Sequence, residues 1–356
     1  QFAPEAKTEY TITAQKAATT AVRFQLHPAD AQVYLYETVS HNRVWPNDDG
    51  TFPLSEGFTY DCSFTKAGYI GQNGNMELTT ENGQKRLTFG TDTYTNLSAV
   101  SVTLQKAAVN SSIFELDAEW ANFRGTDSNN GITDAKTPIS AADGMLYWAS
   151  PLGKGWDNGA VSSPILVDDC LVVYAGNHIY RVNKATGAIE ASGDMAGTSS
   201  FAINGPTYAN GILLVGLSNG RIQAFNAKTL DPMGGQPNCP ITILGDYAYT
   251  GFWNGEALGG SFVCVSLTDE DPTSTTEAKY ATWRHEQDGG FYWAGAYACN
   301  DFIMVGTDDG DALRSYLYLF DPLTGKVLDV KSGFDSDIRS TICYDEARNA
   351  YYFTSK

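Results

Sequence analysis

The sequence lacks the features that mark several large classes of protein. It contains no apolar run of about 18 residues, so we predict no membrane-spanning helix in this chain. Long helical periodicity in Leu, Ala, Glu and Lys is also absent, which predicts little helix. The four histidines are dispersed, with no His-Glu-x-x-His motif and no Ser–His–Asp order. These absences argue against zinc-protease and triad-hydrolase chemistry.

The cysteines and the charge exclude further classes. None of the six cysteines forms a Cys-x-x-Cys or a Cys-Cys pair, which excludes a local zinc knuckle and a haem-attachment motif. Most lie in apolar runs, as buried free thiols do. The net charge of −18 repels phosphate backbones and anionic lipids, so we expect no nucleic-acid partner. This charge serves solubility or, alternatively, holds divalent cations loosely on acidic loops.

Aromatic residues and glycine are abundant, with 20 Tyr, 17 Phe, 7 Trp and 35 Gly, as expected for sheets joined by tight turns. A repeat begins near residue 160, in which two β-rich runs flank a glycine turn and are followed by an Asx-x-x-Thr turn. Two of these turns begin at Asn183 and Asn226, roughly 40 residues apart, which is the period of four-stranded propeller blades. We predict blades at 160–198, 199–238, 239–290 and 291–333, with a fifth from Phe334.

Residues 1–107 lack this repeat and have a different pattern of apolar and polar residues. Alternating apolar and polar residues at 22–26, for example, predict half-buried strands, and the whole segment reads as an antiparallel β-sandwich. Residues 22–75 resemble the PEGA-type carbohydrate-surface module. The matching positions are Pro28, Ala31, Gly50, Phe52, Leu54, Tyr60, Lys66, Gly68 and Tyr69. The resemblance implies an Ig-like or PEGA-like spacer module of a bacterial surface protein.

Residues 118–356 resemble the propellers of pyrroloquinoline-quinone (PQQ) dehydrogenases. The matching features are Trp120, Arg124 and Gly125, the Leu-Tyr-Trp run that ends at Trp148, the Ser-Ser-Pro-x-x-Val run at 162–167 and the Asx-x-x-Thr turns. The resemblance implies a PQQ-like β-propeller but not the cofactor, since many proteins of this fold bind no quinone. The segments 235–242, 251–256 and 289–297 also resemble secreted or surface proteins of Gram-positive gut bacteria.

The last predicted blade stops in mid-blade at 351–356. We therefore expect a truncated chain, whose partner would be a C-terminal fragment that completes the propeller. A predicted strand at 144–149 is expected to pair with the partial last blade, as first strands commonly do in propellers.

Quinone dehydrogenases of this fold use a calcium site, an Asp base and often a vicinal disulfide. The sequence offers no Cys-Cys pair and no clear matching acid, so we expect no cofactor. Calcium is the alternative, because Asp308, Asp309 and Asp311 cluster the hard oxygen ligands that it prefers. The plainer interpretation of this segment is an acidic β-turn.

Two aromatic segments are the sharper binding candidates. Trp253, Asn254 and Glu256 form one, and Tyr292 and Trp293 form the other; on loops at a propeller face they could stack on sugar rings and bind hydroxyl groups. The alternative is that these rings fill the wedge between blades.

Arg339 is a third candidate, because the Asp337–Arg339 pair enters a blade near the propeller centre. The alternative is an ion pair that ties neighbouring blades. The segment 283–286 is predicted to be an outer strand that is exposed at its polar residues, His285 among them.

Together these observations predict an all-β protein of two domains, an Ig-like or PEGA-like sandwich at 1–107 and a PQQ-like propeller at 118–356. We interpret it as a non-enzymatic secreted or cell-surface protein whose propeller is a recognition or scaffolding platform, with a surface glycan or a protein as partner. One alternative is a quinone- or calcium-dependent oxidoreductase. Another is a protein-assembly scaffold that pairs a peptide strand with a blade edge.

Overall fold

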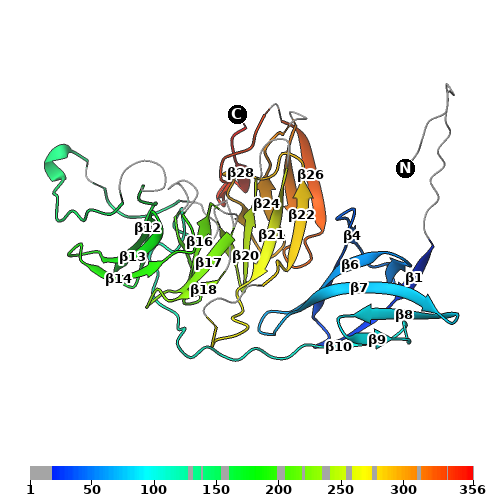
Figure 1. Ribbon diagram of the computed structural model, residues 1–356. Helices are drawn as coiled ribbons and strands as arrows, with labels where there is room; N and C mark the ends of the chain where they lie inside the picture. The colour runs from blue at the N-terminus through cyan, green and yellow to red at the C-terminus, as the bar shows by residue number, and fades with distance from the viewer. Residues whose placement is uncertain are drawn as a thin grey trace, which may run out of the picture. The chain divides into compact units, whose positions relative to one another are not determined.

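The computed structural model describes residues 18–126, 131–137, 139–153, 160–198, 205–218, 221–234, 241–253, 259–274, 279–310, 314–334 and 336–355. The chain divides into two compact units, of which the first comprises Gln1–Thr65 and Gly71–Leu104 and the second Lys66–Ile70 and Gln105–Lys356. Both units are built from strands (Figure 1). Among the described residues, no helix has the length and apolar character needed to cross a membrane.

The described residues of the first unit form ten strands. They are β1 (Thr19–Val22), β2 (Phe24–His27), β3 (Gln32–Glu37), β4 (Arg43–Val44), β5 (Phe52–Ser55), β6 (Thr59–Thr65), β7 (Gln72–Glu81), β8 (Gln84–Phe89), β9 (Asp92–Tyr94) and β10 (Val100–Thr103). A six-stranded sheet has the order β4-β3-β6-β7-β8-β9, and two small sheets pair β1 with β5 and β2 with β10.

Aromatic contacts join these sheets into one core. The Phe24 ring lies 5.5 Å from that of Phe52 and 5.2 Å from that of Phe64, which in turn lies 5.3 Å from Phe89. Edge-to-face packing of this kind stabilises a core beyond simple burial of area. Membership of an Ig-like or PEGA-like family stays a prediction for this unit.

The described part of the second unit has one short 3-10 helix, η1 (Ala141–Asp143), and four antiparallel four-stranded sheets in sequential order. Blade 1 is β11 (Ile165–Val167), β12 (Cys170–Ala175), β13 (His178–Asn183) and β14 (Ile189–Asp194). Blade 2 is β15 (Thr207–Ala209), β16 (Ile212–Leu217), β17 (Arg221–Asn226) and β18 (Pro232–Gly234).

Blade 3 is β19 (Thr242–Leu244), β20 (Tyr247–Gly251), β21 (Gly260–Ser266) and β22 (Trp283–Gln287). Blade 4 is β23 (Tyr297–Ala298), β24 (Ile303–Gly306), β25 (Ser315–Phe320) and β26 (Val327–Phe334). A two-stranded sheet follows, with β27 (Cys343–Asp345) and β28 (Ala350–Tyr352). The sheets fit the predicted blade boundaries closely, with β26 ending just past its predicted limit.

The blades pack face to face as a β-propeller requires (Figure 1). The first strands of neighbouring blades lie beside each other, β11 beside β15 and β19 beside β23. Apolar clusters fill the wedges between blades: Tyr174 and Phe225 belong to the cluster between blades 1 and 2. Between blades 3 and 4, the rings of Phe262 and Phe320 stack at 5.7 Å. Neighbouring sheets therefore bury apolar side chains against each other, and the predicted all-β propeller is confirmed.

The Asx-x-x-Thr turns form as predicted and end the third strand of three blades. In each, the Asx side-chain oxygen accepts hydrogen bonds from backbone N–H groups two and three residues on. Asn183, Asn226 and Asp321 all do so at 2.7–3.2 Å. This local bond is why the motif recurs at the same place in the sheet.

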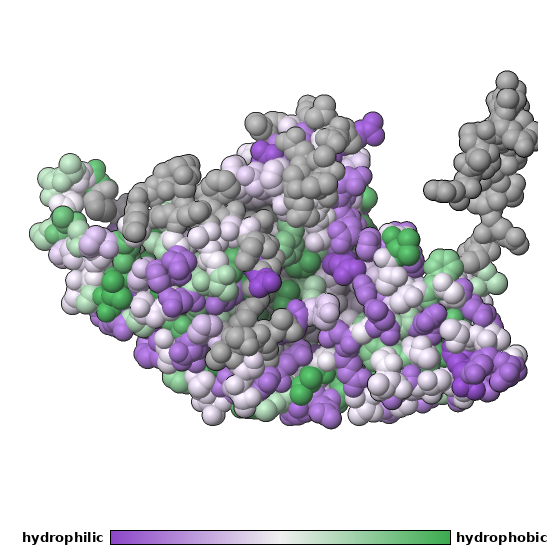
Figure 2. All heavy atoms as spheres, in the orientation of Figure 1, coloured by the Kyte–Doolittle hydropathy of each residue, from purple (hydrophilic) through white to green (hydrophobic). Residues whose placement is uncertain are grey.

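Two stretches that precede blade 1 in the sequence pack against the blades. Residues 108–117, which lie between the two predicted domains, contact blade 2, where the Asn226 amide donates to the Ser112 carbonyl at 2.9 Å. Residues 144–149 form no strand and do not complete the last blade. Instead, the Trp148 indole donates to the Lys184 carbonyl of blade 1 at 3.0 Å, and Leu146 and Tyr147 are more than four-fifths exposed. Figure 2 shows apolar and polar side chains interspersed over this face of the blades.

Candidate functional site

The topology of the blades gathers certain loops at one end of the sheets. In an antiparallel meander, the link from the second to the third strand and the link to the next blade leave from the same end. In blade 3 these links are 252–259 and 288–296, and in blade 4 they are 307–314 and 335–342. The candidate residues named from the sequence all lie in these four links.

Three rings in these links form a continuous stack, which we call the aromatic platform: Trp253, Tyr292 and Trp293. The centroids of Trp253 and Tyr292 lie 4.5 Å apart, and those of Tyr292 and Trp293 lie 4.4 Å apart, both in stacked geometry. Each of the three side chains is only partly buried. The structure thus brings together aromatic residues that lie on separate links of blade 3.

Trp293 holds a backbone conformation that large residues avoid, with φ at +60°. A left-handed φ costs a bulky residue of order 1–3 kcal/mol, and such residues cluster at functional sites. The fold keeps the ring of Trp293 beside Tyr292 in spite of this cost.

Trp253 carries a polar group that the described residues do not satisfy. Its indole Nε1 is buried and has no hydrogen-bond partner among them. Buried donors in folded proteins are nearly always paired, and each exception asks for an explanation. A ligand acceptor at the platform would satisfy this one.

Arg339 lies beside the platform and binds two carboxylates, and we call the three residues the Asp–Arg–Asp cluster. Its Nε and Nη2 each donate to Asp308 at 2.8 Å, and Nη2 lies 3.2 Å from Asp337. The Asp308 side chain is fully buried, whereas that of Arg339 is 24% exposed. Bidentate pairs of this kind are short, strong and geometrically specific. Because Asp308 follows β24 and Arg339 follows β26, the pair ties blade 4 to the segment that leads into β27.

The pKa values of the two carboxyl groups in this cluster are shifted in opposite directions. Burial raises the pKa of Asp308 to about 6, although the Arg339 guanidinium opposes the shift. Burial also acts to raise the pKa of Asp337, but hydrogen bonds from Asp308 and from the Asp309 N–H outweigh it and leave this pKa below its usual range. The hydrogen bond to Asp308 raises the pKa of Arg339, which stays charged. Two carboxyl groups in such close contact share their protons as a pair.

The guanidinium also contacts the platform. The central carbon of Arg339 lies 4.9 Å from the ring centroid of Tyr292 and 5.9 Å from that of Trp293. A cation at this distance is attracted by the ring quadrupole. Arg339 therefore joins the aromatic platform to the buried carboxylates.

Two glycines permit the close packing of the links that carry the platform and the cluster. A Cβ on Gly290, where φ is +69°, would lie 2.9 Å from the Phe252 carbonyl oxygen and from the Gly260 nitrogen. A Cβ on Gly306 would lie 2.2 Å from Ile338 Cγ2, one residue before Arg339. The links can pack this tightly only because these positions carry no side chain.

Of the remaining predicted residues, the structure describes only Asp309. Asn254, Glu256 and Asp311 lie outside the described residues. Asp309 is near the cluster: its N–H donates to Asp337 at 3.1 Å, and its carboxylate accepts from the Ser336 hydroxyl at 3.4 Å. The sequence singled out Asp308 and the Asp337–Arg339 pair, but not the contact between Asp308 and Arg339, because these two residues belong to different links.

The described donors do not fit a calcium–quinone pair. Among these residues no group of three or more His, Cys, Asp or Glu side chains could hold a metal ion. Both oxygens of Asp308 are bound by Arg339, so a cation would have to displace a bidentate guanidinium. We therefore derive no chemistry through such a group.

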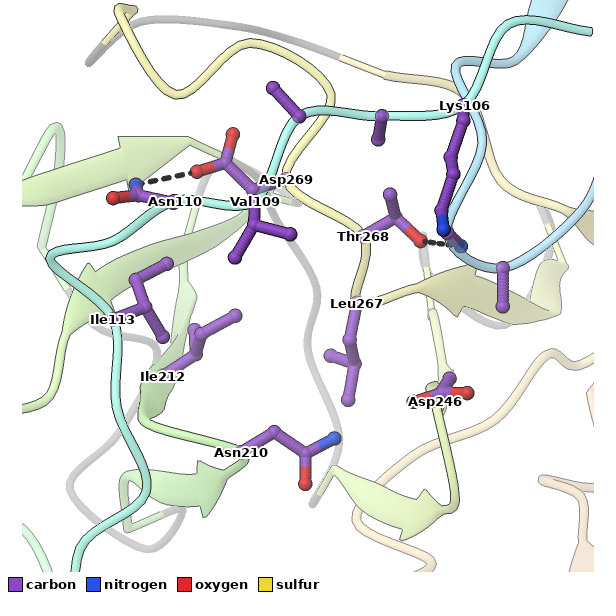
Figure 3. A pocket seen from close by; sticks show the side chains of 14 residues that line it. Lys106, Val109, Asn110, Ile113, Asn210, Ile212, Asp246, Leu267, Thr268 and Asp269 are labelled. Atoms are coloured by element: carbon purple, nitrogen blue, oxygen red, sulfur yellow. Dashed lines mark hydrogen bonds between the residues drawn. The ribbon is translucent and has the colours of Figure 1, made fainter.

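A cavity lies at the opposite end of the sheets, where the first and second strands of blades 2 and 3 are joined. This cavity of about 380 Å³ lies between blades 2 and 3, under the chain at 106–113. Ile113, Ile212 and Leu267 face one another across it, and Asn210 and Asp246 lie at its edge (Figure 3). Its polar edge consists of hairpin-turn residues, and the cavity lacks the stacked rings and buried ion pair of the platform. No sequence pattern marks this cavity, because its lining residues come from segments that lie far apart in the chain.

No family model and no curated protein matches the chain. Among solved structures, quinohemoprotein alcohol dehydrogenase from Comamonas testosteroni matches with a TM-score of 0.50 and 14% identity over 66% of this chain and 45% of that one. A quinohemoprotein alcohol dehydrogenase from Pseudomonas putida matches at 0.49 and 15% over 60% and 40%. BamB from Moraxella catarrhalis matches at 0.39 and 13% over 90% and 95%.

The likeness to the Comamonas enzyme shows the β-propeller fold alone. The chain spans less than half the length of either dehydrogenase. At this level of identity the match assigns no activity, cofactor or partner.

Proposed function

We propose that this is a non-enzymatic recognition protein, secreted or held at a cell surface, whose propeller binds a carbohydrate at the aromatic platform. The observation that carries the proposal is the buried Nε1 of Trp253, a donor without a partner among the described residues, at one end of a stack of partly exposed rings. Sugar rings present apolar C–H faces that stack on aromatic rings and hydroxyl oxygens that accept hydrogen bonds.

The surroundings of the platform suit binding more than chemistry. Asp308 and Asp337 are the two acids of the Asp–Arg–Asp cluster, and Arg339 binds both. A general acid or base must reach the reacting group of its substrate. Carboxylates tied to a guanidinium in this way keep the links in place instead.

The test combines a glycan array with calorimetry on the full chain. We expect an array ligand whose affinity falls about tenfold in Trp253→Phe, which keeps a ring but loses the N–H donor. Tyr292→Ala removes the central ring and should weaken binding further. Trp45→Phe, at a Trp that is 41% exposed in the first unit, is the matched control and should change nothing.

Thermal unfolding of each variant shows whether it is folded. An array without any ligand would overturn the proposal. So would a ligand that binds the folded Trp253 and Tyr292 variants as tightly as the unchanged protein.

A further inference from the structure

The geometry around Arg339 has a consequence for the kind of sugar that the platform can take. A free guanidinium in a sugar-binding site attracts acidic sugars, since it matches a carboxylate with two parallel hydrogen bonds. In this protein the Nε–Nη2 edge of Arg339 is occupied by Asp308, and Nη2 also lies 3.2 Å from Asp337. An acidic ligand would have to compete with a partner that is already in place and fully buried.

Negative charge exceeds positive charge in the cluster. Arg339 pairs with Asp308 and Asp337, and a third acid, Asp309, lies beside them, where its N–H donates to Asp337 at 3.1 Å. Charges that are shielded from water interact more strongly than exposed ones, because solvent and salt screen them less. A further carboxylate brought by a ligand would therefore meet net repulsion, in a chain whose overall charge is already −18.

Arg339 nevertheless has a direct effect on the rings. Its central carbon lies within 5.9 Å of the centroids of both Tyr292 and Trp293. The buried pair with Asp308 fixes the guanidinium, and the guanidinium in turn fixes the two rings. This arrangement describes a residue that acts through its neighbours and not through contact with ligand charge.

We propose that Arg339 is a positioning residue, and that the aromatic platform selects uncharged sugars and rejects sugars that carry a carboxylate. The inference rests on the proposed function and adds the ligand class to it. The selectivity arises from Asp337 and Asp308, whose combined negative charge outweighs the guanidinium charge before any ligand arrives.

The first experiment uses an array in which neutral oligosaccharides stand beside counterparts that differ only by a uronic or sialic acid. We expect binding to neutral members and a signal at least about tenfold weaker for their acidic counterparts. Stronger binding to the acidic members would overturn this inference and leave the proposed function intact. Binding to no member would overturn the proposed function, and this inference with it.

The second experiment changes the charge without removing the pair. Asp337→Asn deletes one carboxylate, leaves the Asp308–Arg339 contacts in place and keeps an oxygen that can accept from the Asp309 N–H. We expect the acidic-to-neutral signal ratio to rise about threefold or more. Asp329→Asn makes the same charge change on β26, where Asp329 pairs with Lys331 at 2.7 Å, and should leave the ratio unchanged.

The variant Arg339→Lys distinguishes a role of Arg339 in positioning the rings from direct contact with the ligand. It keeps the charge but loses the planar fork, so we expect weaker binding of neutral sugars with the same preference over acidic ones. A ratio that stays constant in folded Asp337→Asn would contradict the proposal. A loss of acidic binding alone in Arg339→Lys would also contradict it, since that result assigns Arg339 to ligand contact.

Discussion

Blades 1 and 2 differ from blades 3 and 4 in the link between the second and third strands. In blade 1, β12 passes to β13 through residues 176–177, and Ala175 pairs directly with His178. In blades 3 and 4 the same link occupies 252–259 and 307–314. The longer links carry Trp253 and Asp308, whereas a tight hairpin has no room for such side chains. The same blade framework therefore carries a short link in blade 1 and long links in blades 3 and 4. Binding residues concentrate on loops that a rigid sheet holds in place.

The largest expected difference between the two halves concerns Asp308. Asp308→Ala leaves Arg339 partly buried without its bidentate partner, so we expect a loss of about 3 to 5 kcal/mol in the free energy of unfolding. Asp231→Ala, at an exposed acid of blade 2, should stay within about 0.5 kcal/mol. Urea unfolding of both variants measures the two losses in free energy of unfolding. Equal losses would contradict the expected difference between the two halves.

His285 allows the two halves to be compared through the pH dependence of the free energy of unfolding. Its ring lies 4.8 Å from Tyr318 and 4.9 Å from Phe320 of the next blade, and its Nε2 is buried without a partner among the described residues. Burial lowers the pKa of His285 from 6.5 to about 4. The unfolded chain therefore binds a proton more readily, and stability falls as the pH drops from about 6.5 to about 4, by up to about 3 kcal/mol.

His285→Phe should remove this part of the acid loss. His178→Phe in blade 1, where the imidazole is 44% exposed, should retain it. Unfolding curves between pH 4 and pH 7 measure the difference (the range spans the expected titration). Parallel curves for the unchanged protein and His285→Phe would contradict the assignment.

Glycine substitutions probe how tightly the links of blades 3 and 4 pack. Gly290→Ala meets both a left-handed φ and backbone atoms at 2.9 Å, so we expect a loss of about 2 to 3 kcal/mol. Gly245→Ala has a φ of +57° with nothing within 4 Å, and should cost only about 1 kcal/mol. Thermal unfolding compares the two, and similar costs would mean that the links can open to accept a methyl group.

The smallest stability effect is expected at Trp293. In Trp293→Gly the relief of its left-handed φ offsets the lost ring contacts, so we expect a net change below about 1 kcal/mol together with a clear loss of sugar binding. Asn210→Gly, at a left-handed residue of blade 2, should change neither property. Loss of stability without loss of binding in Trp293→Gly would assign the ring to packing alone.

The blades were predictable because their signals are local. Each Asx turn is closed by a side chain and the backbone two and three residues on, so Asn183 and Asn226 mark strand ends without knowledge of the fold. Residues 144–149 show the limit of such reasoning. Their apolar run is compatible with a strand, but a strand forms only where an edge pairs with it, and the contact of Trp148 with blade 1 prevailed.

The candidate site was predictable in its members but not in its connections. Trp253, Tyr292, Asp308 and Arg339 each carry a recognisable chemistry, yet Asp308 suggested a cation ligand and Arg339 a separate pair. Their contact joins links that follow β24 and β26, and nothing in the intervening sequence records it. His285 was wrongly expected to be exposed, because an outer strand in a propeller is covered on the face that meets the next blade.

The indole N–H of Trp253 tests the central proposal most directly. Its ¹H–¹⁵N signal, assigned by its loss in Trp253→Phe, can be followed while the full chain is titrated with the tightest neutral oligosaccharide of the array. We predict that this signal shifts in proportion to the bound fraction while the indole signal of Trp45 stays in place. A Trp253 signal that stays in place at saturation would contradict a sugar at the aromatic platform.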